Sequence, residues 1–119
     1  MGDHNTFGKL GEQKAVDFLR VSGYQIKVCN YRYLNAEVDI IAEKNGILAI
    51  VEVKSRNTGF LEDISDVITS KKIKLLTMAA NNYVEEFNRD LEVRFDVITV
   101  VKNGDDFEIA HFENAFYHF

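Results

Sequence analysis

Two acidic residues and a lysine stand at a spacing that suits metal-dependent chemistry. Asp39 is followed, after twelve intervening residues, by the triplet Glu52-Val53-Lys54. Between them lies Asn45-Gly46, a dipeptide typical of a two-residue β-hairpin turn. A turn at that point sets Asp39 across from Glu52 on the neighbouring strand. Side chains two residues apart on a strand share a face, so Lys54 joins the same charged patch.

The two facing carboxylates predict a cation between them. Like charges directly opposite each other in a sheet, about 5 Å apart at Cβ, repel unless something neutralises them. Mg²⁺ and Mn²⁺ prefer hard oxygen ligands, with water and substrate phosphate completing the coordination. We therefore expect Asp39 and Glu52 to bind Mg²⁺ or Mn²⁺, and Lys54 to stabilise charge that develops on a phosphate. Together these groups suit hydrolysis of a phosphodiester by metal-activated water.

Three further residues are candidates for the same patch, each with a plainer alternative. Glu12 follows Gly8 and Gly11 near the start of an expected helix, where it would orient water or assist a second metal. Favourable placement of negative charge at a helix N-terminus explains it equally well. Glu37 falls opposite Lys54 on the hairpin, which is either an ordinary cross-strand ion pair or part of the site. Arg56 is interpreted as a contact to a backbone phosphate.

The elements that must position these residues follow from periodicity and turn chemistry. Gly23 is a natural end for the first helix, and Thr69 is a natural N-cap for the second. A strand that follows a helical crossover is expected to pair in parallel within a mixed sheet. The resulting prediction is an α/β domain of order α-β-β-β-α-β-β: helix 9–22, strands 24–32, 36–43 and 47–54, loop 55–63, helix 70–87, and strands 93–101 and 107–112.

The pattern also assigns several residues to the interior. Val38, Ile40 and Ala42 alternate, so we expect them on one apolar face of the hairpin. Asp96 interrupts an apolar strand, and a buried charge there needs an arginine or backbone donor as partner. Cys29 is interpreted as a small core residue. The three histidines, His4, His111 and His118, show no ligand spacing and are interpreted as incidental.

Length and charge restrict the class of protein. A chain of 119 residues is expected to form a single domain, 1–119, with its own core. The net charge is −5, so the global field would not steer DNA strongly; the excess acid lies in residues 61–119, outside the half with the carboxylate pair. No signal-peptide pattern and no apolar run of about 18 residues are present, so the cytoplasm is expected and a membrane is not.

The chain resembles the YraN-like family of small, poorly characterised bacterial proteins thought to be endonucleases. More distantly, it is similar to the PD-(D/E)xK superfamily and to archaeal Holliday junction resolvases. Each matching segment is weak alone, but the ordered set is specific. It comprises Gly8-Lys9-Leu10-Gly11-Glu12 with Ala15, Asn30-Tyr31-Arg32, Glu37 to Ile41, Val51 to Arg56, Thr69 with Lys72, Arg94 to Val97, and Asn114-Ala115-Phe116.

The resemblance implies a restriction-endonuclease-like mixed sheet flanked by helices, with Glu12, Asp39, Glu52 and Lys54 in the catalytic positions. Lys72 matches the family pattern, so it is singled out from a lysine-rich helix face as a nucleic-acid contact. Two departures are Ala36, where the family usually has glycine, and the loop 57–63, which lacks the family's proline and glycine pattern.

Three functions remain open from the sequence. The first is a Mg²⁺- or Mn²⁺-dependent endonuclease acting on DNA, with branched or junction DNA as a candidate substrate; RNA is not excluded. The second is a nucleic-acid-binding module of a repair or recombination complex that does not cut. The third is an interaction domain whose C-terminal aromatic residues support a homodimer or pack on the domain itself, namely Phe112, Phe116, Tyr117 and Phe119.

Overall fold

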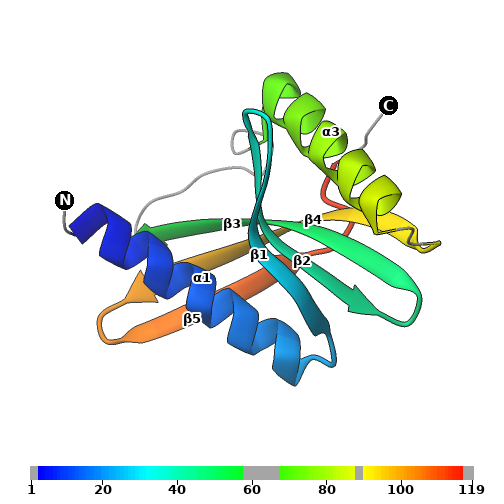
Figure 1. Ribbon diagram of the computed structural model, residues 1–119. Coiled ribbons are helices and arrows are strands. Elements are labelled where there is room, and N and C mark those ends of the chain that lie inside the picture. The colour runs from blue at the N-terminus through cyan, green and yellow to red at the C-terminus, as the bar shows by residue number, and fades with distance from the viewer. Residues whose placement is uncertain (1–2, 58–67, 88–89, 117–119) are drawn as a thin grey trace.

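The strands form one mixed sheet whose spatial order follows the chain, β1-β2-β3-β4-β5 (Figure 1). This is a computed structural model that describes residues 3–57, 68–87 and 90–116. β3 and β4 are parallel and the other neighbours antiparallel, as predicted for a strand that follows a crossover. The elements are α1 (Asp3–Val21), β1 (Gln25–Tyr33), β2 (Ala36–Lys44), β3 (Ile47–Asn57), α3 (Ser70–Glu86), β4 (Glu92–Asn103) and β5 (Asp106–Phe112).

The ends of both helices are set by local chemistry. Gly23 has φ 97° and follows α1, and the Tyr24 N–H donates to the Leu19 carbonyl at 2.9 Å, which satisfies the last turn. Thr69 caps α3, because its hydroxyl accepts the Lys72 N–H at 3.1 Å. Both assignments confirm the sequence prediction, whereas α1 begins six residues earlier than predicted, at Asp3.

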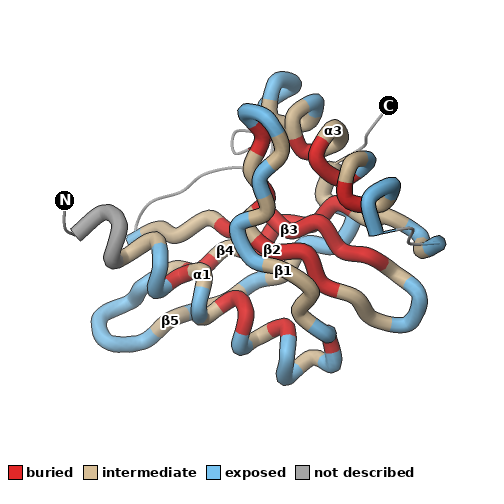
Figure 2. Tube along the Cα trace, viewed as in Figure 1, coloured by how far each residue is buried: buried red, intermediate tan, exposed pale blue. Residues whose placement is uncertain are grey.

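One helix covers each face of the sheet. α1 packs its apolar side on one face, and α3 packs on the other, with the buried residues concentrated between helix and sheet (Figure 2). The alternation of β3 explains this division, because Ala49, Val51 and Val53 face α1 while Leu48 and Ile50 face α3. Both faces of the central strands are therefore covered by a helix along these residues.

β2 and β3 separate beyond a defined point. Their register is the predicted one, from Lys44–Ile47 to Ile40–Val51, and the described pairing stops there. Beyond it β2 stays paired with β1, and this hairpin leaves β3 and rises beside α3 (Figure 1). Val38 consequently packs in the α3 cluster rather than with Ile40 and Ala42, so the prediction that all three share one face is wrong.

Cys29 is exposed, and its prediction as a core residue is also wrong. It lies on β1, one of the two edge strands of the sheet, and all nine residues of this strand are half-buried or exposed. An apolar neighbourhood in the sequence does not reveal whether a strand is central or at an edge.

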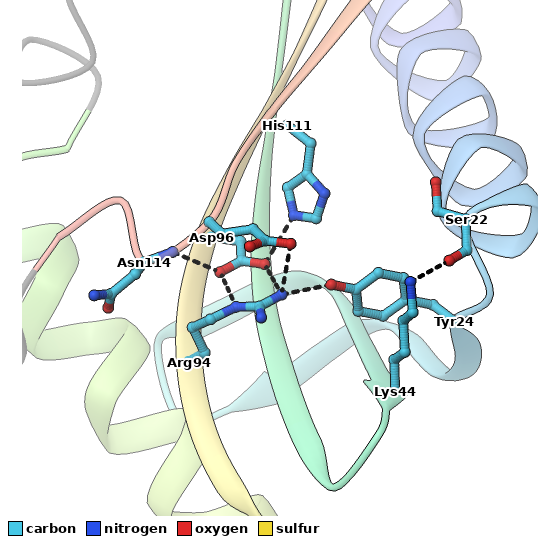
Figure 3. Close-up of polar contacts among 8 residues, drawn as sticks. Ser22, Tyr24, Lys44, Arg94, Asp96, His111 and Asn114 are labelled. Carbon is cyan, nitrogen blue, oxygen red and sulfur yellow. Dashed lines mark hydrogen bonds and ion pairs between the residues drawn. The ribbon is translucent and has the colours of Figure 1, made fainter.

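Asp96 is fully buried and is held by donors from two other segments (Figure 3). Arg94 donates to both carboxylate oxygens, at 2.9 and 2.8 Å. His111 Nε2 lies 2.8 Å from Oδ2, and the Asn114 N–H donates to Oδ1 at 3.0 Å. Burial alone would raise the pKa of Asp96, but these hydrogen bonds outweigh it and lower the pKa. The predicted structural role of Asp96 is confirmed, and His111 is part of it rather than incidental.

Two predictions fall partly outside the described residues. Most of the expected loop 55–63 lies there, although β3 itself continues to Asn57. Of the C-terminal aromatic residues, Tyr117 and Phe119 also lie outside, whereas Phe116 packs against Phe95 with ring centroids 5.3 Å apart. Within the described part of the chain, no helix is long and apolar enough to cross a membrane.

Candidate active site

The separation of β2 and β3 opens a pocket of about 360 Å³. It lies among four elements: the two separated strands, β2 and β3, and the N-terminal parts of the two helices, α1 and α3. All six residues singled out from the sequence line it, four as catalytic groups and two as nucleic-acid contacts. The lining residues are Phe7, Gly8, Glu12, Asp39, Glu52, Val53, Lys54, Ser55, Arg56 and Lys72.

Asp39 takes the place of a missing strand partner. It is the first residue of β2 beyond the paired register, and its Oδ2 accepts the Val53 N–H at 2.8 Å. The side chain therefore satisfies a backbone donor that the separating strand leaves behind. Burial and the nearby charge of Glu52 raise the pKa of Asp39 to about 7, against the opposing effect of the Val53 hydrogen bond.

Glu52 is the most deeply buried acid of the pocket, with 3% of its surface exposed. Its Oε2 lies 3.0 Å from Lys72 Nζ and 3.5 Å from Lys54 Nζ, so two lysines from different elements share one oxygen. The other oxygen, Oε1, is buried with no hydrogen-bond partner. A buried carboxylate oxygen without a partner is costly and calls for an explanation, such as an ion that binds there.

Glu12 enters the pocket from α1 and is held by a residue that the sequence did not assign. Burial, followed by the charge of Glu37, raises the pKa of Glu12, whereas a hydrogen bond from the Asn30 side chain opposes this shift. Asn30 belonged to a matching segment of the family resemblance, which was the available signal for it. A second cavity of about 210 Å³ shares Glu12 and Asp39 with the first and includes Asn30 and Cys29 in its wall.

Gly11 allows α1 to approach β3 closely at this point. A Cβ built on Gly11 would overlap Ser55 Oγ and lie 3.1 Å from Ser55 Cβ. A larger residue would require the Ser55 side chain to rotate and either Ser55 or the helix, and with it Glu12, to shift. No atom of the described residues lies within 4 Å of a Cβ built on Gly8, one turn earlier, so of these two glycines it is Gly11 that the described packing constrains.

The donor set fits a hard divalent cation with open coordination positions. Asp39 and Glu52 offer carboxylate oxygens, one of them orphaned, and their mutual repulsion is what a cation would relieve. Among the described residues, no three His, Cys, Asp or Glu side chains gather closely enough to enclose an ion. A cation bound here would thus need water or substrate oxygens to complete its shell, as Mg²⁺ commonly does in proteins.

The structure corrects the pairing of Glu37 and Lys54. Because β2 and β3 have separated, Glu37 is opposite Arg32 on β1, and their side chains lie 3.6 Å apart. Lys54 instead turns to Glu52 on its own strand. Lys72 is brought to the pocket by α3, and Arg56 lines it from the end of β3. The predicted set is therefore brought together, although the partners within it differ.

Comparison with known proteins places the chain in a family. The sequence model of the uncharacterised protein family UPF0102 matches residues 11–100. A UPF0102 protein of Flavobacterium psychrophilum is 48% identical over 119 residues, covering all of both chains. One from Christiangramia forsetii is 45% identical with the same coverage, and one from Bacteroides fragilis is 44% identical over 98% of this chain and 97% of its own. The chain belongs to the UPF0102 family.

Proposed function

We propose that this member of the UPF0102 family is a Mg²⁺- or Mn²⁺-dependent endonuclease that hydrolyses phosphodiester bonds in DNA, with the restriction-endonuclease-like arrangement of the PD-(D/E)xK superfamily. One observation supports it above the others. A pocket formed where two strands separate holds two carboxylates side by side: the buried Glu52, with an orphaned oxygen, and the half-buried Asp39, with its pKa raised to about 7. Acids are placed this way in active sites more often than in purely structural positions.

The residues of the pocket take distinct roles. Asp39 and Glu52 would hold the cation, which when bound polarises phosphoryl oxygens and lowers the pKa of water. Lys54 and Lys72 carry positive charge to the same wall, where it stabilises negative charge that develops on a transferring phosphate. Glu12, whose pKa is raised, is suited to accept or hold a proton at the edge of the pocket.

Substrate contacts follow from the same geometry. Arg56 lies at the end of β3 beside the pocket and would contact a backbone phosphate, which positions a nucleic acid without reading its sequence. The net charge of −5 predicts weak, salt-sensitive binding, so a feature of the DNA other than its overall charge must contribute. Branched or junction DNA is the candidate substrate.

The alternative is a module that binds nucleic acid without cutting it. It is favoured by one observation, that Lys54 Nζ and Lys72 Nζ both lie within ion-pair distance of Glu52 Oε2, at 3.5 and 3.0 Å, so two cations already offset its charge. In that case the pocket would be a structural ion cluster, and the protein would serve a larger repair or recombination complex.

The test is cleavage of linear, nicked, flapped and four-way-junction DNA with Mn²⁺ or Mg²⁺. We expect wild-type protein to cut at least one substrate, and Glu52→Gln and Lys54→Met to reduce the rate by about 100-fold or more, as removal of a transition-state contact does. Glu108→Gln, an exposed glutamate on β5, is the matched control and should cut like wild type. Equal activity in all four proteins would indicate a contaminant and refute the assignment.

Metal binding separates the two functions. Isothermal titration with Mn²⁺ should give heat with wild-type protein and none with Glu52→Gln. DNA binding that survives in both proteins, with no metal binding and no cleavage in either, would favour the non-cutting module.

A further inference from the structure

The tip of the β1–β2 hairpin carries an exposed leucine in a backbone conformation that leucine disfavours. Tyr33 pairs with Ala36, so Leu34 and Asn35 form the two-residue turn. Leu34 has φ 55°, in the left-handed region, and 76% of its surface is exposed. A residue with a Cβ is strained in this region, and the strain lowers the equilibrium constant for folding by about 5- to 30-fold.

The other hairpins of this chain show what the turn would normally contain. The β4–β5 turn places Gly104, with φ 66°, at the same first position, between the paired residues Asn103 and Asp106. The β2–β3 turn uses Asn45 and Gly46, both of which tolerate positive φ. Leu34 thus stands where a glycine or asparagine would be less strained, and with 76% of its surface exposed it buries little against the described part of the chain.

Exposure alone would have no significance, since single apolar residues are common on protein surfaces. Val21 is more exposed, at 89%, but it ends a helix in ordinary geometry. Leu34 differs because it combines strain with exposure at a tip. Strain of this kind is retained mainly where it serves a function.

The hairpin below the tip is firmly braced. The Tyr31 ring meets the Tyr83 ring of α3 edge to face, with centroids 5.3 Å apart. Asn82 Nδ2 donates to the Tyr31 hydroxyl at 2.7 Å, and Ala36 is buried against the same helix. The tip is therefore a rigid projection beside α3 (Figure 1).

β2 connects this tip directly to the candidate active site. Leu34 precedes Asp39 by five residues, which is at most about 17 Å along an extended strand. Successive nucleotides of a DNA strand rise 3.4 Å, so this span equals about five nucleotides. Arg32, with a side chain 76% exposed, lies near the tip and adds a positive charge to the approach, partly offset by Glu37.

We propose that Leu34 is a wedge that enters DNA at a branch point, so that the pocket acts on the strand about five nucleotides away. Apolar side chains such as leucine part base steps in this manner, and the cost is lowest where pairing is already interrupted. The inference rests on the proposed nuclease function and specifies its substrate as DNA with a junction between paired and unpaired segments.

The test uses a flapped DNA with 2-aminopurine at the branch and Glu52→Gln protein, which should bind without cutting. Binding should raise the fluorescence, because the base leaves the stack. Leu34→Gly in the same background should abolish this rise and weaken flap binding by about 10-fold, the scale of one stacking contact. Affinity for uninterrupted duplex should stay unchanged. Leu34→Phe should keep the rise, and Val21→Ser, at an even more exposed site, should behave like the parent.

Leu34→Gly should also melt no lower than the parent, since glycine relieves the turn. A lower melting temperature would show that Leu34 supports the fold and would overturn the proposal, as would an unchanged fluorescence rise. If Leu34→Gly lost a self-association that the parent shows in sedimentation, while unstacking was unaffected, the tip would be a homodimer contact and the proposal would be overturned.

The wedge and the nuclease can fail separately. If wild-type protein and Leu34→Gly cut at the same positions and the same rate, the proposed nuclease function would stand and the proposed wedge role of Leu34 would be refuted. If unstacking depends on Leu34 but wild-type protein does not cut, the wedge role of Leu34 would stand and the nuclease function would be refuted. Absence of binding to any DNA would remove both.

Discussion

Replacing Asp39 with asparagine measures by how much the second negative charge in the pocket destabilises the folded protein. The folded-state pKa of about 7 lies some three units above the ordinary value of 3.8. Because the pKa is raised, the folded protein binds more protons than the unfolded chain between pH 4 and 7. Stability contributed by this group is therefore highest at acidic pH and falls as the pH rises through that range.

The magnitude follows from the same shift. Three pKa units correspond to about 4 kcal/mol, which is a ceiling because the Asp39 side chain is only partly buried. Asparagine keeps an oxygen that can accept the Val53 N–H, so Asp39→Asn loses the repulsion and retains the hydrogen bond. We expect the variant to be about 1–3 kcal/mol more stable than wild type at pH 8, and equal to it near pH 4.

Urea unfolding at pH 4, 6 and 8 in chelator measures this difference. Asp105→Asn, at an exposed turn position, is the control and should show no such trend. Addition of Mn²⁺ at pH 8 should stabilise wild type by about 3 kcal/mol at 100 times the dissociation constant and leave Asp39→Asn unchanged. A variant that is less stable than wild type at pH 8, or a difference that does not depend on pH, would refute the electrostatic account of this site.

Substitutions at three further places test the surroundings of the pocket: the Asp96 cluster, the glycines of α1, and the two lysines beside Glu52. Asp96→Asn should destabilise the protein by about 3–5 kcal/mol in urea at pH 7, because the Arg94 guanidinium loses the buried carboxylate with which it pairs. The pKa of Asp96 is lowered in the folded protein, so the difference should shrink as the pH falls below 4. Gly11→Ala should lower the melting temperature through its clash with β3, whereas Gly8→Ala, with open space, should raise it slightly. Lys54→Met and Lys72→Met should each cost little alone, but the double variant should lose at least about 2 kcal/mol beyond their sum, because the buried glutamate then has no partner. Additive losses in a double-mutant cycle would contradict that last expectation.

Local signals in the sequence determined the elements and much of the site. Asn45-Gly46 adopts positive φ at both residues, and this turn sets the register that brings Asp39 next to Glu52. Gly23 and Thr69 end and begin helices for reasons contained within a few residues. Turn and cap chemistry depends on the conformation of the residues concerned, so it can be predicted without knowing what packs above them.

The tertiary structure decided how the site is completed. The separation of β2 from β3 beyond Ile40–Val51 depends on the hairpin packing against α3, a contact between distant parts of the chain. Because of that separation, Glu37 pairs with Arg32 on β1, and the Val53 N–H donates its hydrogen bond to the Asp39 carboxylate.

The same holds for contacts that cross between elements. Lys72 reaches Glu52 only because α3 lies over one face of the sheet, and Asn30 reaches Glu12 only because α1 lies over the other. Cys29 is exposed because β1 is an edge strand, a property of sheet order and not of its neighbours in sequence. The sequence by itself determined which residues share a strand and a register; long-range packing decided which of them became partners, because burial and charge pairing depend on elements that the local pattern does not contain.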